Sequence, residues 1–199
     1  EKIYCLSALA AGETANTHAT NRDVPFESPS NKALNITATV LDDGTEVALD
    51  QEQANLLNGQ GVITAINSNG FKLWGNNTAA YPSTTDPKDR WLAVRRFFDW
   101  DGNNFILTYW QKVDKPGNKR LIQSIVDSQN IIGNGYVARD YCAGYRIEFR
   151  DDENPITDLL DGKLTTHTYL APYIPAEKIV NTREYDTAAL EAALTGGSD

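Results

Sequence analysis

Alternating apolar and polar positions mark the clearest strand of this chain, between residues 145 and 149. Tyr145, Ile147 and Phe149 alternate there with Arg146 and Glu148. This period of two is typical of a strand with one buried face. The segment 163–171 carries a similar alternation, and we expect it to be the antiparallel partner of 145–149.

Shorter strands are predicted in the first half of the chain. The segments 34–40 and 46–49 flank a turn-forming sequence at 42–44 and are expected to pair. A buried strand at 61–66 should turn at 68–70 into a second strand at 70–76. The segment 90–96 also predicts a strand, because Leu92 and Val94 alternate with Ala93 and Arg95.

Apolar residues three and four positions apart predict helices elsewhere. The segment 2–12 should form a helix that ends at Gly12, and Asp50 should cap a short helix that ends at Asn58. A helix with an aromatic face is expected within 97–110. The longest helix should begin after Asn118 and reach about Tyr136, with two glycines weakening its end. Loops are expected at 13–32 and 81–89. The pattern predicts an α/β (α+β) fold with a small mixed sheet packed by helices.

Composition narrows the class of protein. The 199 residues carry a formal net charge of -9, which disfavours a binder of nucleic-acid phosphates, and no apolar run is long enough to span a bilayer. We therefore expect a soluble protein made in the cytosol, with Cys5 and Cys142 as unpaired thiols. Methionine is absent even from position 1, so we expect the sequence to be an excerpt of a longer reading frame.

Residues with catalytic potential are few. The two histidines are His18 in a polar loop and His167 in a strand, and no Gly-x-Ser-x-Gly motif accompanies them. The acidic clusters at 42–43 and 151–153 lie at turns and lack the spacing of a calcium loop. No phosphate-binding glycine loop is present. We predict no catalytic residues, no metal and no cofactor; a hydrolase with His18 or His167 as base is the alternative.

Arg95 and Arg96 form a basic doublet, which is too small for a nucleic-acid surface. Arginine pairs well with carboxylates, so we expect both side chains at a domain or subunit contact. A plain solvated face is the alternative reading.

The C-terminal segment predicts a strand that buries little by itself. From residue 177 to 184 polar residues occupy both faces, and Asp186 can cap a short helix with Leu190 and Leu194 four positions apart. Such a strand can pair with a neighbouring chain or within its own chain. The candidate contact residues are Lys178, Ile179, Val180, Asn181, Thr182, Arg183, Glu184, Asp186, Leu190, Glu191 and Leu194.

Several short motifs, in this order and between about residues 10 and 194, resemble the contractile tail sheath proteins of myophages. That family is shared with R-type pyocins and, distantly, with type VI secretion sheaths. The motifs are Ser28-Pro29-Ser30-Asn31, the stretch from Gly70 to Asn76, Asp86-Pro87-Lys88-Asp89-Arg90, Val94-Arg95-Arg96, Phe98-Asp99-Trp100, Leu107-Thr108-Tyr109-Trp110-Gln111, Glu153-Asn154-Pro155 with Thr157-Asp158, and Glu184-Tyr185-Asp186. One departure is Asn77, where relatives usually carry arginine.

The resemblance implies two domains. Residues 1–85 would complete the family's subtilisin-like sheath domain, a name that refers to fold and not to protease activity. Residues 86–199 would form the C-terminal sheath domain, with the linking strand and helix at about 177–195. The stretch from Gly70 to Arg96 would join the two, with Trp74 and Trp91 as packing anchors.

The same resemblance implies a structural role in the tail of a phage or phage-tail-like particle made in a bacterial cytoplasm. Similar subunits stack as hexameric rings around a tail tube, between a baseplate and a tail terminator. Arms at the termini add strands to neighbouring subunits, and contraction drives the tube through the target envelope. This implies other sheath subunits and the tube protein as partners, with no nucleic acid and no membrane insertion by this chain. It also implies that the C-terminal domain and terminal helix lie nearest the tube, with contacts to the tube or a neighbour expected at Asp186, Leu190, Glu191 and Leu194. A monomeric binding module is a further alternative.

Overall fold

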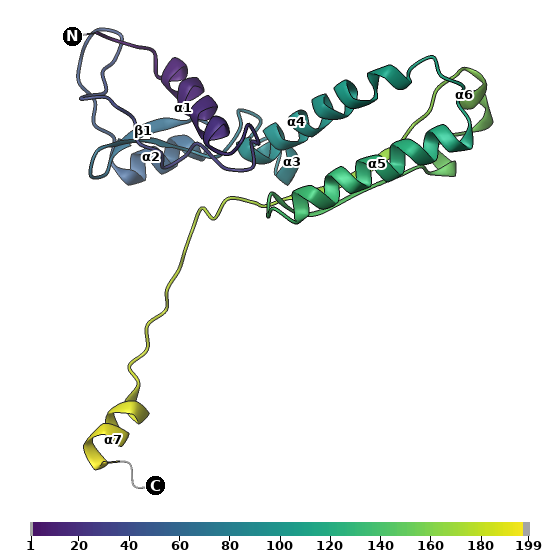
Figure 1. Ribbon diagram of the computed structural model, residues 1–199. Helices are drawn as coiled ribbons and strands as arrows, with labels where there is room; N and C mark the ends of the chain where they lie inside the picture. Colours follow the sequence, from purple (N-terminus) through teal and green to yellow (C-terminus); the bar gives the residue numbers. More distant parts are fainter. Residues whose placement is uncertain (1, 197–199) are drawn as a thin grey trace.

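The computed structural model describes residues 2–196, so residues 1 and 197–199 of the two predicted domain ranges lie outside the described part. Figure 1 shows a body built from two halves, with an extended C-terminal segment leading away from it. The elements are α1 (Leu6–Thr20), α2 (Gln51–Asn58), β1 (Thr64–Asn67), β2 (Phe71–Trp74), α3 (Pro87–Arg90), α4 (Leu92–Tyr109), η1 (Trp110–Lys112), α5 (Lys119–Val137), β3 (Cys142–Glu148), η2 (Asp151–Glu153), α6 (Ile156–Leu160), β4 (His167–Pro172) and α7 (Thr187–Thr195).

The first half packs α1 and α2 around the antiparallel pair β1–β2. Leu34, Ala65 and Leu73 are buried together, and Leu6 and Leu9 of α1 pack against them. The predicted helix after Asp50 is confirmed. The Asp50 side chain accepts a hydrogen bond from the Gln53 amide at 2.8 Å, which completes a capping box.

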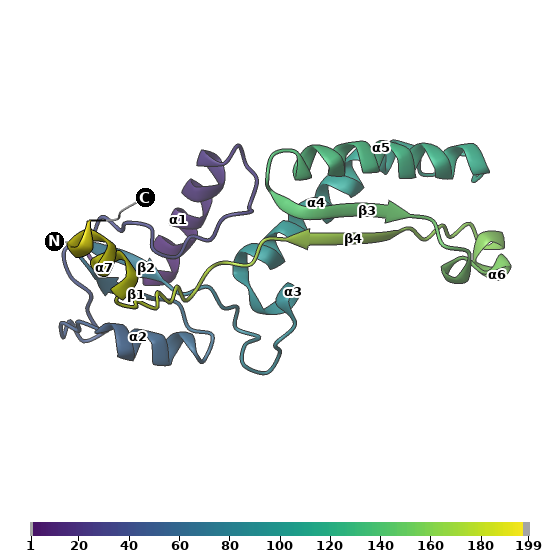
Figure 2. The same cartoon turned by 90° about the horizontal axis from the view of Figure 1, so that it is seen from below.

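The second half combines the long antiparallel helices α4 and α5 with the hairpin of β3 and β4 (Figure 2). Phe97 of α4, Tyr136 of α5 and three residues of β3 form its buried core. The predicted pairing of 145–149 with 163–171 is confirmed, and Asn118 caps α5 as expected. Both sheets are two-stranded and antiparallel, whereas a mixed sheet was expected.

The strand predicted at 90–96 is wrong, because α4 begins at Leu92 and continues to Tyr109. Its buried residues Ala93, Val94, Phe97 and Asp101 recur at helical spacing and form one face. The predicted alternation counted Ala93 among the polar positions, whereas Ala93 is buried beside Val94 on the same face of the helix. Trp91, a predicted packing anchor, is buried at the start of the helix.

The predicted N-terminal helix is displaced. Gly12 lies inside α1, which continues to Thr20 and occupies part of the expected loop. A threonine in this continuation, Thr14, donates its hydroxyl to the Ala10 carbonyl at 2.7 Å. The strand pair expected at 34–40 and 46–49 is reduced to a single bridge between Val40 and Glu46.

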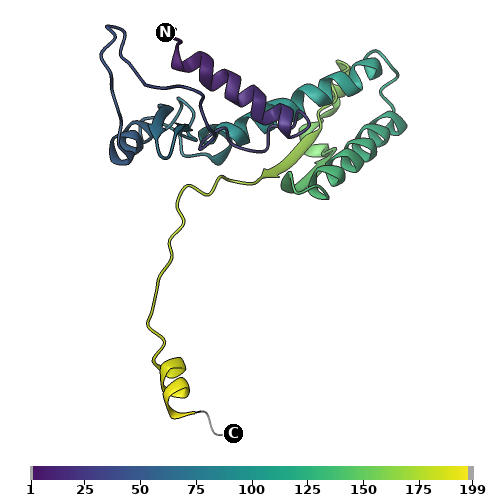
Figure 3. The same cartoon turned by 60° about the vertical axis from the view of Figure 1, so that its left-hand side comes forward.

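Beyond β4 the chain leaves the body. Residues 173–186 form no helix or strand, so the strand predicted at 177–184 is not formed within the described chain. They lead to α7, which stands clear of the body in Figures 1 and 3. We call residues 173–196 the arm. The capped terminal helix was predicted correctly, since the Asp186 carboxylate accepts the Ala189 amide at 2.9 Å.

Candidate assembly surfaces

The arm exposes apolar side chains that the body does not cover. Ile179 is 88% exposed and Val180 73%, close to the values of an unfolded chain. Within the described residues, the segment 178–184 has no strand partner. Its backbone N–H and C=O groups are therefore open to pairing with another strand.

The terminal helix α7 has the same character. Leu190 and Leu194 are 43% and 77% exposed. An isolated helix of this length is marginal in water, and its apolar residues gain stability only against a partner. Asp186 is used in its capping bond, so its side chain is engaged at the start of the helix.

One edge of the β3–β4 hairpin, on the β3 side, is hydrogen-bonded by a side chain. Asn130 of α5 donates to the Ile147 carbonyl at 2.9 Å and accepts from the Ile147 amide at 3.0 Å. This side chain satisfies the backbone of β3 on the side away from β4, as a further strand would. Strand addition at that position would have to displace Asn130.

The side chains of Arg95 and Arg96 make different contacts. Arg95 contacts Asp89 at 2.9 Å and Asp99 at 3.1 Å, and these hydrogen bonds raise the pKa of its guanidinium. The carboxylate partners expected for Arg95 therefore lie in its own chain. Arg96 instead lies 3.4 Å from both ring nitrogens of His18 at the end of α1. The structure leaves their predicted role in subunit contacts untested.

The two histidines lie in separate surroundings. Burial and the neighbouring Arg96 lower the pKa of His18, and Asp23 opposes that shift. The His167 Nδ1 lies 2.7 Å from Glu153 Oε1. Within residues 2–196, no group of three acidic, cysteine or histidine side chains is arranged to hold a metal ion. Nor does any helix of that range have the length and apolarity to cross a membrane.

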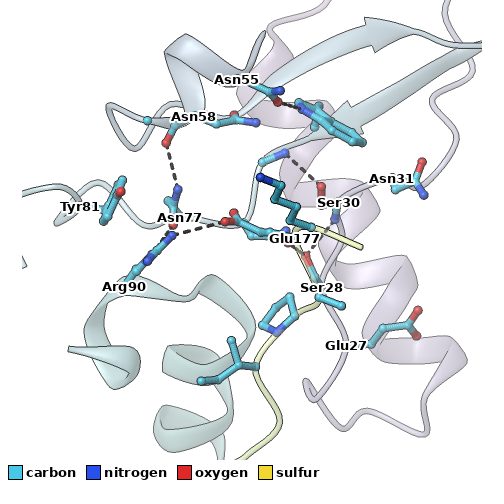
Figure 4. A pocket seen from close by; sticks show the side chains of 18 of the residues that line it. Glu27, Ser28, Ser30, Asn31, Asn55, Asn58, Asn77, Tyr81, Arg90 and Glu177 are labelled. Carbon is cyan, nitrogen blue, oxygen red and sulfur yellow. Dashed lines mark hydrogen bonds and ion pairs between the residues drawn. The ribbon is translucent and has the colours of Figure 1, made fainter. Parts of the chain in front are cut away.

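A groove of about 830 Å³ lies where the arm leaves the body (Figure 4). Residues 173–178 form part of its lining, opposite polar residues of the first half. At its centre Arg90 contacts Glu177 at 3.3 Å and donates to the Asn77 side chain at 3.0 Å. Glu177 lies at the edge of the predicted arm, but neither Arg90 nor the groove was predicted as a contact. The two partners of Arg90, Glu177 and Asn77, are 87 and 13 positions away from it in sequence, and no local pattern indicates such pairs.

Asn77, the departure from the sheath pattern, has a defined structural role. It is 4% exposed and donates its amide to the Asn58 carbonyl at 3.0 Å. Asn77 thus connects the end of α2 to Arg90. The Arg90 side chain supplies a positive charge next to Asn77.

Comparison with known proteins finds relatives in sequence and in fold. The chain is 29% identical over 201 residues to the tail sheath protein of Burkholderia phage BcepMu, an alignment that covers 100% of the chain and 41% of that protein. It is 30% identical over 154 residues to the tail sheath protein of Escherichia phage P2, covering 75% of the chain and 36% of the relative. No protein-family profile matches the chain.

These sequence relatives are tail sheath proteins, and the chain resembles their C-terminal part. Solved contractile assemblies share its fold. The anti-feeding prophage baseplate contains a chain with a TM-score of 0.76 at 22% identity, covering 91% of this chain and 50% of that one. The sheath of an extracellular contractile injection system in the contracted state gives a TM-score of 0.75 at 20% identity, covering 92% and 52%. The chain thus spans about two fifths to one half of the sheath relatives that it matches, and it corresponds to their C-terminal part.

Proposed function

We propose that this chain is the C-terminal part of a structural subunit of a contractile tail sheath. In a phage or phage-tail-like particle the subunits would polymerise around a tail tube and contract to drive the tube through a target envelope. The observation that carries this proposal is the arm, which exposes unpaired backbone and large apolar side chains outside the body. An extended segment of this kind is stabilised as a strand when another chain pairs with it.

The partners in this proposal follow from the sheath relatives. Other subunits, in hexameric rings stacked helically, would receive the arm, with the tube protein inside the rings. A baseplate and a tail terminator would bound the sheath at its two ends. No catalytic residue and no cofactor are assigned, and the hydrolase alternative is not supported.

Two domains remain part of the proposal, with a boundary near residue 85. Two separate buried clusters support it, since Leu34, Ala65 and Leu73 belong to one and Phe97 and Tyr145 to the other. Val24 also belongs to the second cluster, so the loop after α1 packs across the boundary. Arg95 and Arg96 lie beyond it, at the start of α4.

Truncation of the arm tests the proposed function. In the full-length protein, removal of residues 178–199 should abolish polymers and leave dispersed subunits, because the unpaired strand and α7 would be lost. Negative-stain electron microscopy and light scattering measure this. The isolated body should keep its thermal unfolding temperature, since residues 178–195 form no hydrogen bond or ion pair with it. Long intact sheaths from the truncated protein would contradict the proposal.

A further inference from the structure

Over residues 173–195, the arm is joined to the body by one ion pair. The Arg90–Glu177 ion pair joins them at 3.3 Å, with the two side chains 25% and 37% exposed. Among residues 173–195, no other hydrogen bond or ion pair reaches the body. Within residues 173–195, Glu177 is therefore the last position that a hydrogen bond or ion pair joins to the body.

Arg90 is held in place by contacts within the body that do not involve Glu177. Its Nε donates to the buried Asn77 side chain, and its guanidinium carbon lies 4.4 Å from the ring centre of Tyr81 and 4.1 Å from that of Trp91. A guanidinium between two aromatic rings loses little further freedom when it binds a carboxylate. The body thus presents a preformed arginine to the arm, as Figure 4 shows.

The surroundings of the pair leave space for the arm to move. Residues 173–178 line the open groove of about 830 Å³ and do not fill it. Polar side chains on the opposite wall already bond within the body, as Trp74 Nε1 does with Asn55 Oδ1 at 2.9 Å. The groove offers the arm a surface to rest on, with few fixed bonds.

We propose that Arg90 and Glu177 form a latch that sets where, and in which direction, the arm leaves the body. Arg90 is the positioning residue, and the backbone after Glu177 is the pivot. An ion pair with this exposure favours the closed over the open arrangement by only a few-fold. The latch can therefore open without loss of the fold, while the arm stays covalently attached. Its use in assembly rests on the proposed function, but the latch itself is a property of this chain.

Spin-label distance measurements test the latch in the isolated chain. Labels at Thr182→Cys in the arm and Asn103→Cys on the exposed side of α4, in a Cys5→Ser background, report the position of the arm. The parent should give one dominant distance. Glu177→Gln should broaden that distribution, and Glu177→Lys should broaden it further because it places like charges together. An unchanged distribution in Glu177→Gln would overturn the proposal.

Glu184→Gln is the matched control, since Glu184 is an exposed arm carboxylate whose side chain has no bonded partner in the described part of the chain. It should leave the distances unchanged. Raising the salt concentration should broaden the parent distribution but leave Glu177→Gln unaffected, because only the parent has the ion pair to screen. Equal broadening in both would overturn the latch. The result does not depend on polymerisation, so failure of the latch is distinguishable from failure of the proposed sheath function.

Discussion

Asp101 of α4 is an acidic residue whose carboxyl group is buried. It is 6% exposed, and its Oδ2 accepts the Tyr145 hydroxyl at 3.3 Å. Tyr145 in turn accepts the Gln129 side-chain amide at 2.7 Å. Asp101 Oδ1 and Gln129 Oε1 are buried without a donor in the described structure. Burial raises the pKa of Asp101 to about 6, and the bond from Tyr145 opposes that shift.

This elevated pKa gives stability a definite pH dependence. Unfolded Asp101 would ionise near its ordinary value of 3.8, whereas the folded group keeps its proton to about 6. Between these values the folded state binds more protons, so the contribution of Asp101 to stability falls as pH rises and is lost above pH 6. The loss is on the order of 2–3 kcal/mol.

Asp101→Asn should remove this dependence, because the amide stays neutral over this pH range. Denaturant unfolding at pH 4 and pH 7 measures the difference between variant and parent. The variant should gain stability relative to the parent as pH rises. Asp127→Asn, an exposed acid on α5, is the control and should follow the parent. The same pH dependence in Asp101→Asn and parent would contradict this account.

No sequence pattern identifies Asp101, because an acidic residue in a helix normally faces solvent. Its burial depends on Tyr145 and Gln129, which other elements bring to it. Arg90 was likewise not identified from the sequence, because its partners Asn77 and Glu177 are not local to it. Single residues were predicted well only where their partners are local, as with the caps Asp50, Asn118 and Asp186.

At the scale of elements, the close approach of α5 to β3 depends on one glycine. A Cβ at Gly133 would lie 2.0 Å from the Tyr145 ring, a distance that no packed carbon tolerates. At Gly135, two positions on, the nearest contact would be the mobile end of Arg139 at 3.5 Å. Both glycines weaken a helix in isolation, but only Gly133 is required by the packing.

The pair provides a matched test. Gly133→Ala should lower the free energy of unfolding by about 2–3 kcal/mol, because Tyr145 or α5 must shift. Gly135→Ala should raise it by up to about 1 kcal/mol, since alanine favours the helix. Denaturant unfolding of both variants gives the comparison. Equal effects of the two substitutions would mean that helix propensity, and not the approach to β3, controls this position.

Element prediction succeeded where pattern and length agree. The long periodic helix α5 and the alternating β3 are recognisable because tertiary packing reinforces their local preference. Segment 90–96 failed because seven residues contain too few turns to separate the two periods. Segments 34–40 and 46–49 have strand-like composition, but only Val40 and Glu46 form a bridge. The composition of these segments favours an extended backbone, but they do not join a sheet.

At the scale of the whole molecule, the arm and body are stabilised by different means. The body has its own buried clusters, whereas Leu190 and Leu194 of the arm remain exposed. The arm was predicted as the segment 177–195 because its pattern lacks a buried face. The groove in which the arm lies on the body was not predicted, since it combines residues 26–90 with residues 173–178, which are far apart in sequence.

Substitution of both leucines tests whether α7 carries assembly energy. Leu190→Ser with Leu194→Ser should leave the unfolding temperature of this chain unchanged, because surface substitutions away from packed features have small effects. In the full-length protein the double variant should form few or no polymers, as sedimentation and electron microscopy would show. Ala188→Ser with Ala192→Ser adds the same hydroxyls to α7 and should polymerise normally. Normal polymers from the leucine variant would exclude α7 as an anchor.

The extended course of residues 173–186 also sets a local concentration. At about 3.3 Å per residue, this segment reaches roughly 45 Å from the body. A neighbour that holds α7 is confined within that radius, which corresponds to an effective concentration of a few millimolar. Contacts between two bodies could then break and re-form in a new arrangement without the subunits diffusing apart. A weak body-to-body interface is sufficient as long as the neighbour keeps α7 bound.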